Sequence, residues 1–159
     1  SGLVLMARGI EAQRALSLAF EKRRVHKHYT AVVCGVLRNA LPDNSWSTID
    51  LPLLLDWQNR PRSVVNHTEG KPSLTRWCVA ESGPGDPPHT TRLALEPFTG
   101  RSHQLRVHLQ AIGHPIVGDP LYGAAPPEPG QRLLLHAEGI RFPHPTTGEA
   151  MAFVAPCPF

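Results

Sequence analysis

The stretch that most restricts the fold is KHYTAVVCGVL, which runs from Lys27 to Leu37. It is rich in β-branched and aromatic residues, and its apolar residues occupy both alternating positions. A strand with one face in water alternates apolar and polar residues, whereas a strand covered on both faces reads as a nearly continuous apolar run. We therefore expect this segment to be a central strand of a sheet with both faces covered.

Further strand patterns lie around this segment and are separated by turn-forming residues. Thr48 to Leu55 is apolar but contains Pro52, which indicates an edge or interrupted strand because proline cannot donate a ladder hydrogen bond. Asp56 to Pro72 is predicted to be a long polar loop or an irregular ribbon. Residues 3–7, 73–81, 90–98, 132–145 and 149–159 have strand patterns, and residues 39–47, 82–89 and 124–131 have turn or loop patterns.

Two segments have the periodicity of amphipathic helices. The first lies within Ile10 to Arg24, where apolar residues recur at i, i+3 and i+4. The second is predicted to have Ser102 as its N-cap and to end at Gly113. Strands outnumber helices and do not alternate regularly with them. We therefore predict an α+β fold, with one domain over residues 1–159 and a mixed, mostly antiparallel sheet flanked by a few helices and loops.

The basic residues are concentrated in the first two thirds of the chain. Up to Arg106 there are 14 basic and 9 acidic residues, whereas the rest has 2 basic and 4 acidic residues. This distribution fits a polyanionic partner, and it fits a solvated helix face equally well. The densest group of cations consists of Arg8, Arg14, Lys22, Arg23, Arg24 and Lys27.

Cysteine usage and hydropathy point to a cellular compartment. Cys34, Cys78 and Cys157 are odd in number and form no CxxC pair, so neither a disulfide framework nor a zinc knuckle is suggested. No apolar run approaches the ~18 residues that span a bilayer. We expect a soluble, monomeric chain in the reducing cytoplasm.

The segment FTGRSHQLRVHL concentrates polar chemistry at the start of the second predicted helix. A helix N-terminus with Arg101, His103, Gln104 and Arg106 can bind a carboxylate or a phosphate, and the same residues can form an ion-pair network between helix and sheet. Nine histidines raise the question of a metal. Because His103 and His108 are five residues apart, about 140° around a helix, they do not match an i, i+4 ligand pair, and we expect no metal site.

Three segments together resemble the RluA family of RNA pseudouridine synthases. They are RRVHKHYTAVVCG (Arg23 to Gly35), LEPFTGRSHQLRVHLQAIGHPIVGDPLYG (Leu95 to Gly123) and RLLLHAEGIRFPHPTTGEAMAFVAPCPF (Arg132 to Phe159). The pair LPLLLDWQNRP and GKPSLTRW is similar to the RluA subfamily itself, whose members modify both large-subunit ribosomal RNA and a transfer-RNA anticodon stem-loop. The resemblance implies the pseudouridine synthase fold, an RNA partner and no cofactor.

The resemblance also implies the main catalytic residues. The family isomerises uridine with an aspartate in a pattern of the form HRLDxxTSG. Ser1 and Gly2 match the end of this pattern, so the aspartate is expected four residues before Ser1 and the chain is expected to lack the N-terminal part of the catalytic domain. Tyr29 matches the tyrosine that stacks on the extracted uracil and takes part in proton transfer, and Arg101 matches the basic residue that pairs with the aspartate.

Other basic and polar residues are candidates for RNA contacts. Arg23, Arg24 and Lys27 are expected to contact the RNA backbone, and Gln104 and Arg106 to line the pocket or contact phosphates. Asp119 belongs to another family block, where we expect a structural role. The alternative hypothesis is an RNA-binding remnant that kept the fold and lost the nucleophile.

Overall fold

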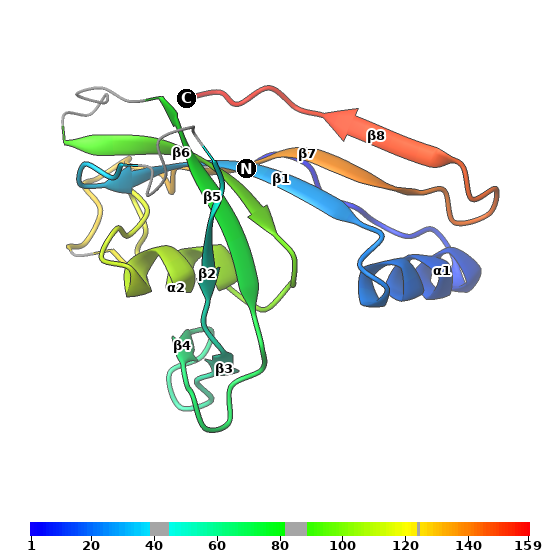
Figure 1. The fold of residues 1–159 in the computed structure, drawn as a ribbon, viewed down its shortest axis with the longest axis horizontal. Helices are drawn as coiled ribbons and strands as arrows, with labels where there is room; N and C mark the ends of the chain where they lie inside the picture. The colour runs from blue at the N-terminus through cyan, green and yellow to red at the C-terminus, as the bar shows by residue number, and fades with distance from the viewer. Residues whose placement is uncertain (39–44, 82–88, 124) are drawn as a thin grey trace.

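The computed structural model describes residues 1–38, 45–81, 89–123 and 125–159, which form two helices and eight strands (Figure 1). Most of each predicted turn, residues 39–44 of 39–47 and residues 82–88 of 82–89, lies outside the described residues. Neither described helix is long and apolar enough to cross a membrane. In chain order the elements are α1 (Ile10–Glu21), β1 (His26–Cys34), β2 (Ser47–Asp50), β3 (Leu53–Leu55), β4 (Ser63–Val65), β5 (Leu74–Glu81), β6 (Thr90–Pro97), α2 (Gln104–Ala111), β7 (Leu135–Pro143) and β8 (Ala150–Val154).

Six strands form one sheet in the order β2-β5-β6-β1-β7-β8, and every neighbouring pair is antiparallel. The prediction of a central strand is confirmed, because β1 lies between β6 and β7. Thr30 to Val33 are buried at both alternating positions. The α+β prediction is confirmed as well: both helices lie on the same side of the sheet, one towards each end (Figure 1).

The main core lies between α2 and the centre of the sheet. Ala31, Val33, Leu93 and Leu95 pack there with Leu105 and Leu109 of α2, and all six are at most 6% exposed. A second cluster holds α1 to the other end of the sheet through Leu16 and Ala19. The two helices therefore cover different parts of one sheet face.

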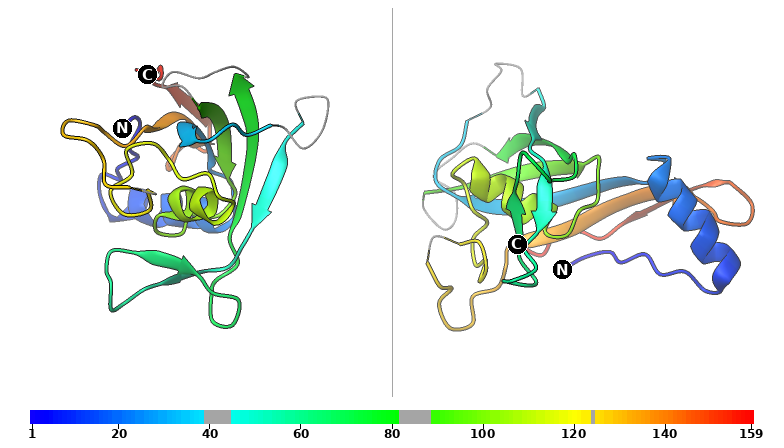
Figure 2. Two further views of the ribbon diagram at one scale, coloured as in Figure 1. Left: turned by 90° about the vertical axis from the view of Figure 1, so that its left-hand side faces the viewer. Right: turned by 90° about the horizontal axis from the view of Figure 1, so that it is seen from below.

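Pro52 interrupts its segment as predicted. β2 lies at the edge of the large sheet, and after Pro52 the chain leaves that sheet to pair β3 with β4 in a separate two-stranded ribbon. The ribbon stands away from the large sheet (Figures 1 and 2). Of the two alternatives for Asp56 to Pro72, the ribbon is the one that forms.

Near the N-terminus, the predictions for residues 3–7 and for the end of the first helix differ from the structure. Residues 3–7 are not a strand: Gly2 forms an isolated bridge with Ala137, and Leu3 N–H donates to the Ala137 carbonyl at 2.9 Å. From Gly139 onwards β7 pairs with β1 on one edge and with β8 on the other. Residues 4–7 therefore have no free edge of β7 with which they could pair. The first helix ends at Glu21, so the cations that follow belong to the connection with β1.

A buried polar chain connects α2 to β5. His108 is fully buried, and its Nε2 lies 3.1 Å from the Leu51 carbonyl, which can only accept, so Nε2 carries the proton. Its Nδ1 then accepts from the Thr75 hydroxyl at 3.0 Å, and Thr75 in turn accepts from the Gln104 amide. This arrangement fits a neutral imidazole at His108, the form that its burial favours.

The neutral state of His108 predicts a pH-dependent stability. Burial lowers the pKa of His108, although the Leu51 hydrogen bond and the charge of Asp50 act in the opposite direction. The unfolded chain therefore binds a proton more readily, and stability present above pH ~6.5 is lost as the pH falls below it. Urea unfolding at several pH values should show a shallower decline for His108→Gln than for the wild type.

The matched control for this experiment is His67→Gln, at an exposed position. It should keep the wild-type slope. Equal slopes for the wild type and His108→Gln would show that His108 is not the group that is protonated on unfolding.

Candidate functional site

Tyr29 lies in β1 on the side of the sheet that carries α2. It is paired with Leu95 of β6 and Ala137 of β7, and its ring packs against the main core while remaining half-exposed. The register with β7 shifts between His28 and Tyr29, and such a bulge re-aims the side chains beside it. Burial raises the pKa of Tyr29, so its hydroxyl is protonated at neutral pH.

The loop between β6 and α2 brings Arg101 to this side of the sheet. Its backbone N–H donates to the Gln104 side-chain oxygen at 3.1 Å, and its exposed guanidinium donates to the Pro72 carbonyl at 3.4 Å. The same Gln104 oxygen accepts from the Thr99 hydroxyl at 2.7 Å. The loop is thus fixed from inside the protein while the charged end of Arg101 faces solvent.

Lys27 connects β1 to this loop. Its Nζ donates to the Thr99 carbonyl at 3.0 Å, and a Cβ at Gly100 would lie 3.5 Å from Nζ. Burial lowers the pKa of Lys27. The structure thus brings Lys27 to the loop that carries Arg101, and Tyr29 lies two residues farther along the same strand.

The N-terminal residues lie one strand away from Tyr29. Ser1 donates from its amino group to the Leu135 carbonyl at 3.0 Å and accepts from the Ala137 N–H at 2.9 Å, and its hydroxyl lies 2.9 Å from His136 Nδ1. Gly2 bridges to Ala137, which pairs with Tyr29 on its other edge. A Cβ at Gly2 would lie 2.3 Å from the Ala137 oxygen, so only glycine fits this close approach.

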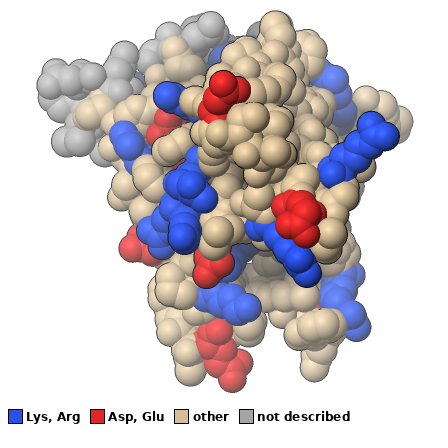
Figure 3. Space-filling view, turned by 90° about the vertical axis from the view of Figure 1, so that its right-hand side faces the viewer, with Lys and Arg blue, Asp and Glu red and all other residues tan. Residues whose placement is uncertain are grey.

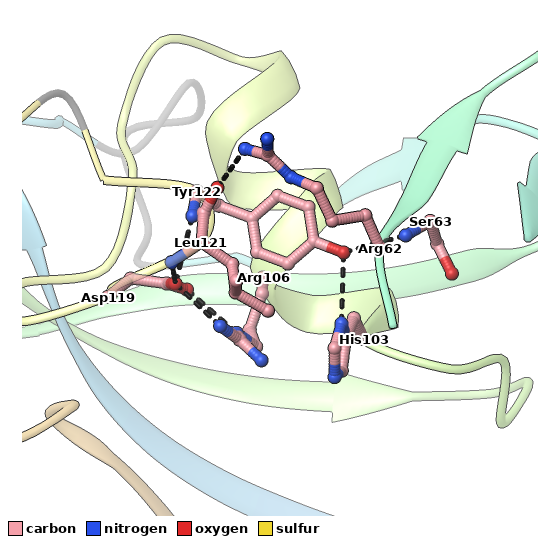
Figure 4. Close-up of polar contacts among 7 residues, drawn as sticks. All are labelled: Arg62, Ser63, His103, Arg106, Asp119, Leu121 and Tyr122. Carbon is pink, nitrogen blue, oxygen red and sulfur yellow. Dashed lines mark hydrogen bonds and ion pairs between the residues drawn. The ribbon is translucent and has the colours of Figure 1, made fainter. Parts of the chain in front are cut away.

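A second network holds the start of α2 (Figure 4). Arg106 forms two hydrogen bonds with Asp119, at 2.8 and 2.6 Å, and Asp119 also accepts from the backbone N–H groups of Leu121 and Tyr122. The Tyr122 hydroxyl accepts from the Ser63 N–H at 2.7 Å and lies 2.9 Å from His103 Nδ1. This network joins α2, the loop after it and the β3–β4 ribbon.

The charges of this network are balanced inside the protein. Burial alone would raise the pKa of Asp119, but the hydrogen bonds from Arg106, Leu121 and Tyr122 outweigh it, and its pKa lies below the ordinary value. Burial and the charge of Arg106 lower the pKa of His103 against the opposing charge of Asp119. A neutral His103 can accept a hydrogen bond from the Tyr122 hydroxyl at Nδ1, which agrees with the 2.9 Å distance between the two atoms.

The helix begins differently from the prediction. Its N-cap is His103 in the left-handed conformation (φ 55°), and the predicted cap Ser102 is wrong. The reason is a turn in which the Gln104 N–H bonds to the Arg101 carbonyl at 3.1 Å, which leaves Ser102 exposed within the turn. For Arg106 the structure agrees with the ion-pair network rather than with an anion site.

The expected RNA-contacting residues fall into two groups. Arg23 and Arg24 are exposed in the connection after α1, and Lys27 follows them. Gln104 is 3% exposed and Arg106 is bonded to Asp119. All four hydrogen-bonding positions of the Gln104 amide are used inside the protein, whereas Arg106 uses two of its five N–H groups on Asp119, and a contact of either side chain with phosphates stays a prediction.

A groove of about 520 Å³ opens between β1, β6, β7 and β8, and both Arg23 and Lys27 line it. Arg141 and Phe98 also line it, and sequence reasoning missed both. Only the strand register brings Arg141 opposite His26. Basic and acidic side chains are interspersed over the end of the molecule that carries α1 (Figure 3), so the basic residues form no uniform patch there.

Comparisons with known proteins identify the family to which this chain is similar. Residues 1–111 match the family model described as RNA pseudouridylate synthase. The dual-specificity RNA pseudouridine synthase RluA of Pasteurella multocida is 45% identical over 162 residues, covering 100% of this chain and 69% of that protein. The protein of the same name from Escherichia coli (strain K12) is 43% identical with the same coverage.

Solved structures are similar in fold. Human RNA Pseudouridylate Synthase Domain Containing 1 superimposes with a TM-score of 0.72 at 32% identity, over 95% of this chain. Human RNA Pseudouridylate Synthase Domain Containing 4 superimposes with a TM-score of 0.68 at 24% identity, over 92% of this chain. This chain spans 62% and 63% of the two human chains, which is less than two thirds of each.

The buried pair predicts a large loss of stability when it is broken. In Asp119→Asn the nearly buried Arg106 guanidinium loses its counter-charge, since the side chains are 12% and 0% exposed. We expect the free energy of unfolding to fall by about 3–5 kcal/mol in urea denaturation.

Glu96→Gln is the matched control, because it breaks a 3.8 Å pair with Arg76 in which both side chains are 36% exposed. That loss should stay within about 1 kcal/mol. Similar losses in the two variants would contradict the structural role of the buried pair.

Proposed function

The chain belongs to the RluA family of RNA pseudouridine synthases, and we propose that residues 1–159 form the part of its catalytic domain that holds uridine during isomerisation to pseudouridine. The observation that supports this most strongly is that three segments are joined through hydrogen bonds of β1 and β7. They are β1 with Tyr29, the loop with Arg101, and Ser1 to Leu3 beside β7.

The chemistry assigns a separate task to each residue. Pseudouridine formation exchanges the bond from the sugar C1′ to N1 of uracil for a bond from C1′ to C5. C5 loses one proton and N1 gains one, so a base must reach C5. Tyr29 is our candidate for that base and for the surface on which the uracil stacks. Its raised pKa makes the phenolate a scarcer but stronger base.

We assign the nucleophile to an aspartate encoded four residues before Ser1, with Arg101 as its partner. An arginine beside a carboxylate lowers the pKa of that carboxylate by roughly 1–3 units, which keeps it ionised. The exposed guanidinium of Arg101 and its internally fixed backbone suit this role. Asp119 is unsuited to it because its oxygens already accept four hydrogen bonds.

We propose ribosomal RNA and a transfer-RNA stem-loop as substrates, because the relatives at 45% and 43% identity are named dual-specificity enzymes and the RluA subfamily that the sequence resembles modifies both RNAs. A base inside a helix must be extracted at a cost of a few kcal/mol, which stacking on an aromatic side chain offsets in large part. Arg23, Arg24 and Lys27 would position the RNA backbone. Gln104 and Arg106 would act as positioning residues within the protein.

The rival hypothesis is an RNA-binding remnant without a nucleophile. The codon four positions upstream of Ser1 separates the two hypotheses most cheaply. Any residue other than aspartate there would remove the enzyme claim and leave RNA binding as the function.

Substitution of the two proposed catalytic residues in the full-length protein tests the mechanism. Tyr29→Phe removes only the hydroxyl, so it should lower pseudouridine formation by roughly 10²- to 10⁴-fold while RNA affinity stays within a few-fold. Arg101→Met should lower the rate strongly without a comparable loss of stability, because the Arg101 side chain is exposed. Rates come from single-turnover assays on a transfer-RNA anticodon stem-loop, and stability from urea unfolding.

Arg14→Met is the control for Arg101→Met, since Arg14 is exposed on α1 and pairs only with Glu11 among the contacts described. It should turn over like the wild type. Wild-type rates in Tyr29→Phe would remove Tyr29 from the chemistry, and wild-type rates in Arg101→Met would remove the proposed carboxylate pairing.

A further inference from the structure

The tip of the β3–β4 ribbon presents an exposed tryptophan. Trp57 is 64% exposed, although its large apolar ring would be more stable out of water. The Arg60 guanidinium carbon lies 4.2 Å from the ring centroid, and Arg60 Nε donates to the Trp57 carbonyl at 3.2 Å. An arginine over one face of an indole is a cation–π contact that leaves the other face open.

The tip is held in shape by its own hydrogen bonds. Asn59 donates from its side chain and its backbone to the two Asp56 carboxylate oxygens, at 2.9 and 3.2 Å. Asp56 N–H donates to the Arg62 carbonyl at 2.9 Å, and Arg62 N–H donates to the Asn59 carbonyl at 3.1 Å. The ring of Trp57 therefore belongs to a preformed turn, so little ordering is needed before a ligand binds.

The ribbon is anchored next to the proposed active site. At its base, Leu53 and Lys71 exchange two backbone hydrogen bonds of 3.0 and 2.8 Å, and the following carbonyl, that of Pro72, accepts from Arg101. Higher up, Arg62 donates to the Leu121 carbonyl (Figure 4). The ribbon extends on the side of the sheet where α2 lies (Figure 1), and its base adjoins Arg101, where the proposed function places the RNA.

The surroundings of Trp57 favour a nucleic acid over a protein as its partner. Residues 58–62 are all exposed, and they comprise an amide pair, two arginines and a proline. A protein-docking surface has an apolar centre depleted of charge, whereas a single aromatic ring among cations and amides is typical of surfaces that stack unpaired bases.

We propose that Trp57 and Arg60 form a second RNA contact, in which an unpaired base near the target uridine stacks on the indole and Arg60 contacts its phosphate or its ring. The proposal rests on the proposed function for the identity of the RNA. The contact is tolerant of base identity, because every base has a π-face. A single stacking surface of this kind would serve RNAs of different sequence.

Binding of a transfer-RNA anticodon stem-loop to the full-length protein tests this proposal. Trp57→Ala should weaken binding roughly 5- to 100-fold, and Trp57→Phe should restore most of the affinity because it keeps an aromatic face. RNA should quench part of the wild-type tryptophan emission, and that part should be absent in Trp57→Phe. Urea unfolding should give the same midpoint for all three proteins, since the ring is exposed.

Val64→Ala is the matched control, because Val64 is also exposed on the ribbon, at 40%. It should bind RNA like the wild type. Unchanged affinity and unchanged quenching in the Trp57 variants, with a wild type that forms pseudouridine, would overturn the proposal while leaving the proposed function intact. A wild type that binds RNA with Trp57-dependent quenching but forms no pseudouridine would overturn the proposed function and support the contact.

Discussion

The arrangement of the candidate site depends on one buried amide, that of Gln104. Its oxygen accepts from Thr99 and from the Arg101 backbone, and its nitrogen donates to Leu74 and Thr75, so all four of its hydrogen-bonding positions are used. These bonds join the loop, the first turn of α2 and β5. An isolated amide of this kind would be costly to bury, but a fully bonded one specifies a single geometry. The loop that carries Arg101 is therefore positioned from within the core.

The sequence predicted the architecture where a residue type has one dominant physical effect. The doubly apolar run around Ala31 could only be covered on both faces, and Pro52 could not continue a central strand. The start of α2 was predicted less well, because Ser102 is an intrinsically good cap while the observed start depends on a bond between Gln104 and a loop. The strand predicted at residues 3–7 does not form, because β8, from the other end of the chain, occupies the edge of β7 with which these residues would pair.

The polar motif around Arg101 divides into structural and exposed members in a way that residue type does not reveal. Arg101 and Arg106 have the same chemistry and are five positions apart, yet one guanidinium faces solvent and the other is bonded to Asp119. The difference arises from a carboxylate 13 residues farther along the chain. A resemblance assigns the whole motif to one site. The contacts distinguish Gln104 and Arg106, which are bonded inside the protein, from Arg101, whose side chain is exposed.

The bonds of Ser1 with β7 have a consequence for how the protein matures. Ser1 and Gly2 contact residues some 134 positions later, so the sheet beside Tyr29 cannot be completed until Ala137 has left the ribosome. Contacts of such long sequence separation form late, because the loop-closure entropy must be overcome before they contribute. A nascent chain that ends before β7 therefore lacks one of the two neighbours of the strand that carries Tyr29.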